Sequence, residues 1–189
     1  MRRIILASKS PRRAELLGRL IKIFEIEESR IKENTGEADP EKLVRALARE
    51  KAADVFARNP GAVVIGADTV VYCAGRILGK PKDEADAREM VALLAGRVHT
   101  VYTGVCVLAD GFSRTVSAAT DVTFDEMTAA EMDAYIAAGD WADKAGAYAI
   151  QGAAGKHITC IDGDYYNVVG LPLNELYRVL KEILKRKLI

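Results

Sequence analysis

The sequence predicts an α/β fold: a mixed, twisted sheet with helices flanking it. Segments typical of strands and of helices alternate along the chain. Ala62–Gly66 is apolar throughout, as is typical of a strand buried on both faces. Two long strand-like stretches, 98–108 and 113–124, flank the turn pair Asp110-Gly111, which favours an antiparallel hairpin. The hairpin disfavours a purely parallel, doubly wound sheet.

The remaining elements follow from local signals. Arg3–Ala7 is a short apolar strand, and Ser10 and Pro11 are typical of the cap and first turn of a helix. Polar and turn-forming residues predict a loop over Glu27–Asp39. We expect further strands at Lys22–Ile26 and Ile158–Ile161, and further helices at Pro40–Arg58, Asp83–Leu94 and Leu173–Lys187. Thr128 is expected to cap one more helix, which runs to Ala138.

Length and composition narrow the function classes. The 189 residues suit a single domain, 1–189, of at most two lobes. The 27 basic and 27 acidic residues cancel, which disfavours a protein that coats nucleic acid or a membrane. No apolar run approaches the roughly 18 residues of a membrane span.

The cysteines and histidines are few. Cys73, Cys106 and Cys160 are far apart and lie in apolar runs, so we expect buried thiols in a reducing cytoplasm. His99 and His157 stand near no other metal-ligating residue at a useful spacing.

Ser8-Lys9-Ser10-Pro11-Arg12-Arg13 is the first candidate for a functional site. A strand ends here and a helix begins, so free backbone N–H groups, two hydroxyls and two guanidiniums come together. Such a set suits an anion, above all a polyphosphate. A capped helix with two solvated arginines is the alternative.

Asp68 is the second candidate, in Gly66-Ala67-Asp68-Thr69. The sequence predicts that a strand ends here and presents a carboxylate, which suits a Mg²⁺ ligand or a general base. An ordinary aspartate in a turn is the alternative.

Two further segments carry weaker signals. Gly75–Pro81 is no P-loop, which needs four residues between its glycines and Ser or Thr after its Lys; here three residues separate the glycines and Pro81 follows Lys80. Lys80 is then either a single phosphate contact or an ordinary lysine in a turn. Gln151, in the small-residue segment Asp143–Gly152, offers an amide that suits a base edge, unless the segment is a simple loop. Glu33 and Lys51 look like solvated charges.

Six motifs, taken in order, resemble those of the Maf family of nucleoside triphosphate pyrophosphatases. They cover nearly the whole chain, and their order is far more specific than any one of them. The motifs are SxSPRRxELL (8–17), AREKA (48–52), GADTVV (66–71), GKP (79–81), DKAGAYxIQG (143–152) and YxxVVGLP (165–172).

The resemblance implies an elongated, two-lobed α/β fold around a central cleft, related to that of the inosine triphosphate pyrophosphatases. It implies cleavage of the α–β phosphoanhydride with a divalent cation, Mg²⁺ or Mn²⁺, and a possible homodimer. Asp68 matches the family's catalytic aspartate. Ser8, Ser10, Arg12 and Arg13 match its phosphate-binding helix start, and Glu33, Lys51 and Lys80 match polar residues of the cleft.

Arg12, Thr69 and Gln151 together resemble the branch that acts on dTTP and UTP. We therefore expect a dTTP/UTP pyrophosphatase in which Glu33 and Asp68 hold the metal, or in which Asp68 instead takes the proton of the attacking water. Two alternatives stay open: the same chemistry on modified nucleotides, and a regulator of septum formation that acts by binding a partner.

Overall fold

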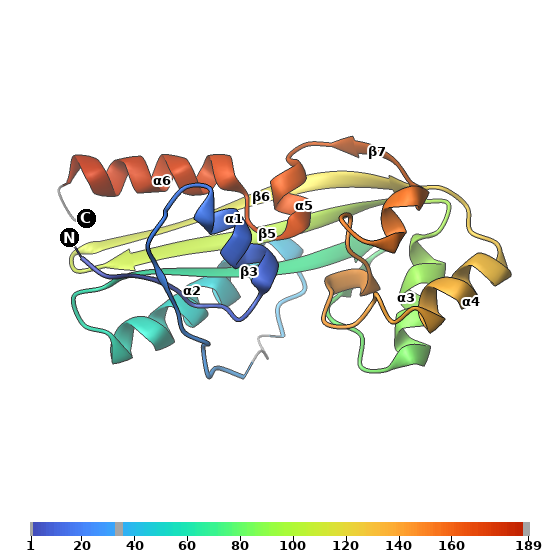
Figure 1. Cartoon of the computed structure of the whole chain (residues 1–189), viewed down its shortest axis with the longest axis horizontal. Coiled ribbons are helices and arrows are strands. Elements are labelled where there is room, and N and C mark those ends of the chain that lie inside the picture. Colours follow the sequence, from blue (N-terminus) through green and yellow to red (C-terminus); the bar gives the residue numbers. More distant parts are fainter. Residues whose placement is uncertain (1, 33–35, 187–189) are drawn as a thin grey trace. The chain divides into compact units, whose positions relative to one another are not determined.

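A seven-stranded mixed sheet organises the part of the chain that the structure, a computed structural model, describes: residues 2–32 and 36–186 (Figure 1). The strand order is β2-β1-β3-β5-β6-β7, with β4 paired to β3. The strands are β1 (Ile4–Leu6), β2 (Glu25–Ile26), β3 (Val63–Cys73), β4 (Arg76–Leu78), β5 (Val98–Ala109), β6 (Phe112–Phe124) and β7 (Ile158–Asp162). Because β1 is parallel to β2 and β3 while β4 and β7 are antiparallel to their partners, the predicted mixed sheet is confirmed.

The predicted helices are present, and Ser10 and Thr128 cap two of them as predicted; Lys187, the predicted end of the last helix, lies outside the described residues. Ser10 Oγ accepts a hydrogen bond from Arg13 N, and Thr128 forms a capping box with Glu131. The helices are α1 (Pro11–Gly18), α2 (Pro40–Arg58), α3 (Glu84–Leu94), α4 (Ala129–Ala137), α5 (Tyr165–Val169) and α6 (Leu173–Lys185), with 3₁₀ turns η1 (Ala145–Ala147) and η2 (Ala153–His157).

The chain folds into two compact units. Unit 1 is drawn from residues 1–68, 103–118 and 170–189, and unit 2 from residues 69–102 and 119–169. The long strands β3, β5 and β6 each continue from one unit into the other.

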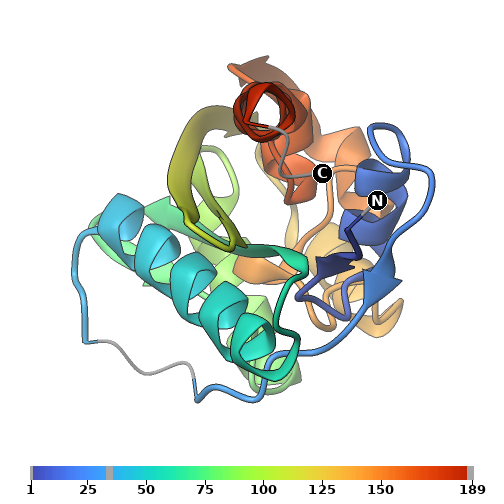
Figure 2. The same cartoon turned by 90° about the vertical axis from the view of Figure 1, so that its left-hand side faces the viewer.

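In unit 1, α2 lies on one face of the sheet, and α1 and α6 lie on the other (Figure 2). Two glycines bring α2 unusually close to the strands. A Cβ built on Gly66 would lie 2.7 Å from Ala52 N, and one on Gly104 would lie 2.8 Å from Arg45 N. Because real Cβ atoms do not approach backbone so closely, only glycine permits this spacing between helix and sheet.

Unit 2 has its own core, which includes three rings in edge-on contact. His99, Phe124 and Tyr148 have ring centroids 4.8–5.3 Å apart, and His99 Nε2 lies 2.7 Å from the Tyr148 hydroxyl. Burial lowers the pKa of His99 to about 4, against the opposing effect of the Asp121 carboxylate. The imidazole is therefore neutral at physiological pH.

The structure corrects three expectations. β3 does not end near Gly66 but continues to Cys73, so Asp68 lies in mid-strand; the β-branched run Thr69-Val70-Val71 extends the strand. The strand expected over Lys22–Ile26 is only two residues long and exposed.

The third correction concerns a thiol. Cys73 and Cys106 are buried as expected, but Cys160 is exposed, because it lies on β7 at an edge of the sheet.

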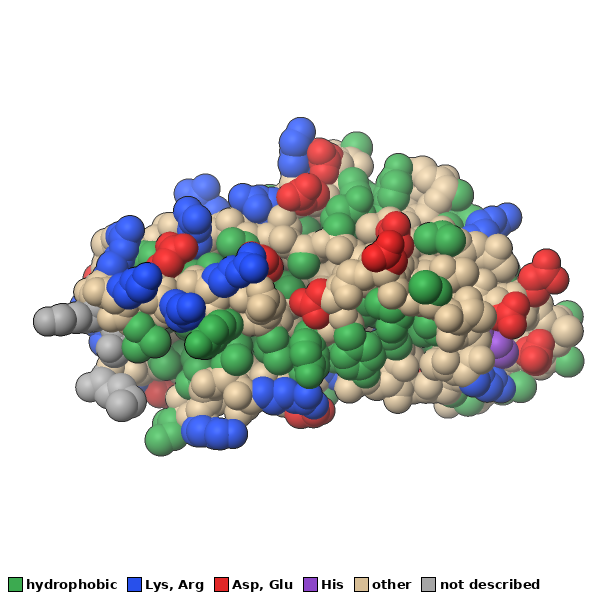
Figure 3. Space-filling model, turned by 90° about the horizontal axis from the view of Figure 1, so that it is seen from above, with side chains coloured by type: hydrophobic (Ala, Val, Ile, Leu, Met, Phe, Trp, Pro, Cys, Tyr) green, Lys and Arg blue, Asp and Glu red, His purple; other side chains and the backbone are tan. Residues whose placement is uncertain are grey.

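The exterior is mixed in character. On the face drawn in Figure 3, Lys and Arg side chains form several groups separated by uncharged or acidic surface. Among the described residues, no helix is both long and apolar enough to cross a membrane.

Candidate functional site

The start of α1 brings together Ser8, Ser10, Arg12 and Arg13, the residues expected to bind an anion. Ser8 is buried, and its Oγ accepts from Ser10 N at 3.2 Å, which holds the chain as it turns from β1 into the helix. Ser10 caps the helix by accepting from Arg13 N, and Pro11 has no N–H. Of residues 11–13, these contacts leave the N–H of Arg12 for a ligand. With no acidic residue in the first turn, the positive end of the helix dipole is not compensated locally.

Arg12 and Arg13 have different roles at this corner. Arg13 Nε donates to Gly170 O at 2.9 Å and its Nη1 to Ser8 Oγ at 3.4 Å, so this guanidinium ties the helix start to the segment before α6. Arg12 is half-buried and makes no hydrogen bond or ion pair with the described part of the chain. The Arg12 guanidinium is therefore available to an anionic ligand.

Asp68 and Lys51 form a buried ion pair. Lys51 Nζ donates to Asp68 Oδ1 at 2.6 Å, and the two side chains are only 12% and 9% exposed. Lys51 comes from α2 and Asp68 from β3, and the close approach of helix and strand at Gly66 brings the two charges together. The ammonium orients the carboxylate and compensates its charge.

The sheet brings this pair and the helix start to the same region of unit 1. β1 and β3 are parallel, with Leu6 opposite Ile65, and Ala7 N donates to Ile65 O at 2.8 Å. The two strands thus run side by side up to Ala7 and Ile65, one residue before Ser8 and three residues before Asp68. Of the candidate residues, unit 1 contains Ser8, Ser10, Arg12, Arg13, Lys51 and Asp68.

Unit 2 contains the other described candidates: Thr69, Lys80 and Gln151. Gly146 N donates to Gly79 O at 3.0 Å, so the loop of Lys80 is tied to the segment that leads to Gln151. Lys80 Nζ lies 3.9 Å from Asp143 Oδ1, an exposed and weak pairing. Thr69 directly follows Asp68 on β3 and is half-buried.

Gln151 lies in a tight turn held by Asp140. Asp140 Oδ2 accepts from Ala153 N at 2.8 Å, and Gly152 N donates to Ala149 O at 3.0 Å. Gln151 itself is exposed, and its amide makes no hydrogen bond within the described residues. Sequence reasoning missed Asp140, because an isolated aspartate after a helix carries no signal of this contact.

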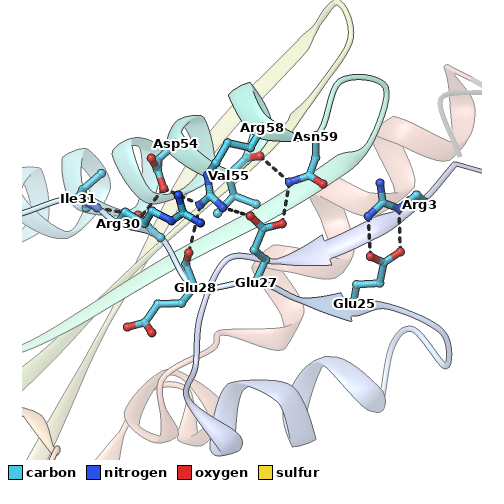
Figure 4. A network of polar contacts seen from close by, with 11 residues as sticks. Arg3, Glu25, Glu27, Glu28, Arg30, Ile31, Asp54, Val55, Arg58 and Asn59 are labelled. Carbon is cyan, nitrogen blue, oxygen red and sulfur yellow. Dashed lines mark hydrogen bonds and ion pairs between the residues drawn. The ribbon is translucent and has the colours of Figure 1, made fainter.

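Glu33 lies outside the described residues. The chain leading toward it is anchored to the end of α2 by a polar network (Figure 4). Arg58 pairs with Glu27 and Asp54, and Asp54 Oδ2 accepts from Arg30 N at 2.9 Å. This network fixes the path of residues 27–31 along α2.

The donor set suits a hard cation that the substrate helps to hold. Among the described residues, no three acidic, histidine or cysteine side chains gather into a metal cage. Asp68 supplies carboxylate oxygen, and Mg²⁺ is commonly held by one or two carboxylates together with substrate phosphates. The residues present therefore fit such a cation.

A buried carboxylate paired with a lysine, and a helix start with two hydroxyls and two guanidiniums, are the main polar features of the candidate site in this α/β protein. The chain belongs to the Maf family: the family model described as Maf-like protein matches residues 3–183.

Curated relatives share almost the whole chain. The dTTP/UTP pyrophosphatase of Bacillus cereus (strain AH187) is 49% identical over 183 residues, covering 96% of each chain. That of Bacillus anthracis (strain CDC 684 / NRRL 3495) is 48% identical over the same length and coverage. The solved structure of the Staphylococcus aureus Ham1 protein is similar over 65% of this chain and 72% of that one. The sequence identity is 13% and the TM-score is 0.46.

Proposed function

We propose that this protein is a nucleoside triphosphate pyrophosphatase that hydrolyses dTTP and UTP to the nucleoside monophosphate and pyrophosphate. One observation carries the proposal: a chain 49% identical to a protein named dTTP/UTP pyrophosphatase has a buried Lys51–Asp68 pair in the same unit as a helix start with Ser10, Arg12 and Arg13.

The reaction needs a base, a nucleophile and compensation of charge. A water attacks the α-phosphorus and gives its proton to Asp68, while the bond from that phosphorus to the bridging oxygen breaks and pyrophosphate leaves with the electron pair. Lys51 holds the Asp68 carboxylate in place for this transfer. Arg12, Ser10 and the N-terminus of α1 bind the phosphate oxygens, where negative charge grows.

Base recognition falls to unit 2 in this proposal. The amide of Gln151 can donate to a carbonyl and accept from the imide N–H of uracil or thymine. Lys80 contributes positive charge toward the phosphates, and Thr69 a hydroxyl. We propose that residues 1–189 act as a single functional domain.

A divalent cation, Mg²⁺ or Mn²⁺, completes the proposed site. Asp68 and Glu33 would hold it, and when bound it neutralises phosphate oxygens and orients the attacking water. We also propose that the protein works in the cytoplasm, where its free thiols stay reduced, and that it forms a homodimer, as the family resemblance implies.

Substrate profiling tests the proposal directly. Pyrophosphate release is measured from a panel of common and modified nucleoside triphosphates, with Mg²⁺ and with Mn²⁺. We expect dTTP and UTP to have the highest kcat/KM, and Asp68→Asn to lower kcat at least about a hundredfold. Asp162→Asn, an exposed aspartate on β7, is the matched control. Preference for another base, or an active Asp68→Asn variant, would refute the assignment.

A further inference from the structure

We propose that Asp140 is a positioning residue that fixes the turn carrying Gln151 and so determines the selectivity of the enzyme for uracil and thymine. The inference rests on the proposed function, because it assumes that Gln151 reads the base. Asp140 itself is not proposed to touch the nucleotide.

The first support is a direct tether on the turn. Asp140 Oδ2 accepts from Ala153 N at 2.8 Å, two residues after Gln151. Backbone bonds of 3.0 Å, from Gly152 N to Ala149 O and from Gly155 N to Gly152 O, close the chain on either side. The Gln151 backbone is thus bracketed by bonds, while its side chain is left exposed.

The second support is the other carboxylate oxygen. Asp140 Oδ1 lies 3.4 Å from Lys144 Nζ, and these side chains are 29% and 14% exposed. Lys144 belongs to the DKAG segment that precedes Gln151. One carboxylate therefore links the segment before Gln151 to the residue that follows its turn.

The third support is steric and independent of the hydrogen bonds. A Cβ built on Gly152 would collide with Asp140 Oδ2 and would lie 3.0 Å from Asp140 Cγ. Residue 152 therefore has to be glycine if the carboxylate is to stay against the backbone of the turn. Gly152 and Asp140 form a matched pair next to the residue that reads the base.

A freely moving turn would present the amide of Gln151 in many orientations. Discrimination by hydrogen bonding requires donors and acceptors held in place before the ligand arrives. The tether of Asp140 supplies that order, so its loss should weaken the binding of the correct base more than the chemistry at phosphorus.

The test compares Asp140→Ala with Asp140→Asn, using kcat and KM for dTTP, UTP and dCTP. Asn keeps an oxygen that can accept from Ala153 N, whereas Ala removes it. We expect Asp140→Ala to lower the preference for dTTP over dCTP by about tenfold, mainly through KM, and Asp140→Asn to keep most of it. Asp133→Ala, which removes an exposed carboxylate paired with Arg88, is the matched control.

Two further variants, Gly152→Ala and Gln151→Ala, separate a failure of the positioning inference from a failure of the proposed function. Gly152→Ala displaces the carboxylate from the opposite side and should lower the same preference, which covers the case that Asp140→Ala does not fold. If Gln151→Ala leaves the preference intact, the base-reading part of the proposed function is wrong. Two other results would overturn the positioning inference alone. In the first, Gln151→Ala lowers the preference for dTTP over dCTP but neither Asp140→Ala nor Gly152→Ala lowers it. In the second, Asp140→Ala and Gly152→Ala slow the hydrolysis of all nucleotides equally.

Discussion

Lys51 Nζ and Asp68 Oδ1 are 2.6 Å apart, and both side chains are almost wholly buried, although they come from a helix and a strand 17 positions apart in sequence. This geometry makes each charge depend on the other, because an ion buried without its partner keeps its full desolvation cost.

Lys51→Met should therefore destabilise the fold as well as abolish activity. We expect a loss of about 3 kcal/mol, the size typical of breaking a buried pair from one side. In Lys51→Met/Asp68→Asn the loss should be smaller than the sum of the single losses, because no uncompensated carboxylate remains. Urea denaturation of the four proteins measures this coupling, and strictly additive losses would contradict it.

Gly66→Ala should push α2 away from β3. The added Cβ would lie 2.7 Å from Ala52 N and 2.9 Å from Ala52 Cβ, so the backbone itself has to move. We expect about 2 kcal/mol lower stability, with lower kcat because Lys51 moves with the helix. Gly18→Ala is the control. Gly18 is the last residue of α1, and a Cβ built on it would have no atom within 4 Å, so this variant should be as stable as the parent protein.

Arg12→Ala and Arg13→Ala should separate binding from architecture. Arg12 has no partner within the described protein, so its loss should raise KM for the triphosphate with little change in melting temperature. Arg13 bonds to Gly170 O and Ser8 Oγ, so its loss should also lower stability, by about 2 kcal/mol. Calorimetry beside steady-state kinetics tests this, and equal melting temperatures for the two variants would count against the distinction.

Because of His99, the free energy of unfolding should decrease as the pH falls. Its pKa is lowered to about 4 in the fold, mainly by burial, from 6.5 in the unfolded chain. Between these values the unfolded state binds the extra proton, so stability decreases as the pH falls from 6.5 to 4, by about 3 kcal/mol in full.

His99→Leu, which cannot titrate, should flatten this part of the stability profile, even if the loss of the Tyr148 contact lowers the whole curve. Urea midpoints from pH 7 to pH 4.5 provide the measurement. A variant as steep as the parent protein would assign the acid sensitivity to other groups.

Local signals were enough for much of the fold. The caps at Ser10 and Thr128 and the turn at Asp110-Gly111 act within a few residues, so the sequence displays them directly. The course of β3 through Asp68 was missed, because a strand that carries a buried charge needs a partner that local pattern does not reveal.

The same limit applies to the site. Lys51 looks like a surface charge on its helix, and only the packing of α2 at Gly66 shows that it is buried against Asp68. Asp140 and its matched glycine are joined by a turn whose geometry no spacing predicts. The family resemblance selected Lys51 without giving the physical reason, and it did not select Asp140.

Because Cys160 on β7 is exposed, its thiol can be labelled selectively in the folded protein. Burial raises the pKa of the Cys73 and Cys106 thiols, which keeps them protonated and shielded from reagents. A maleimide fluorophore should therefore attach to the native protein at a single position, in unit 2. The two buried thiols would then react only in molecules that have unfolded, so the rate of their labelling measures the rate of unfolding.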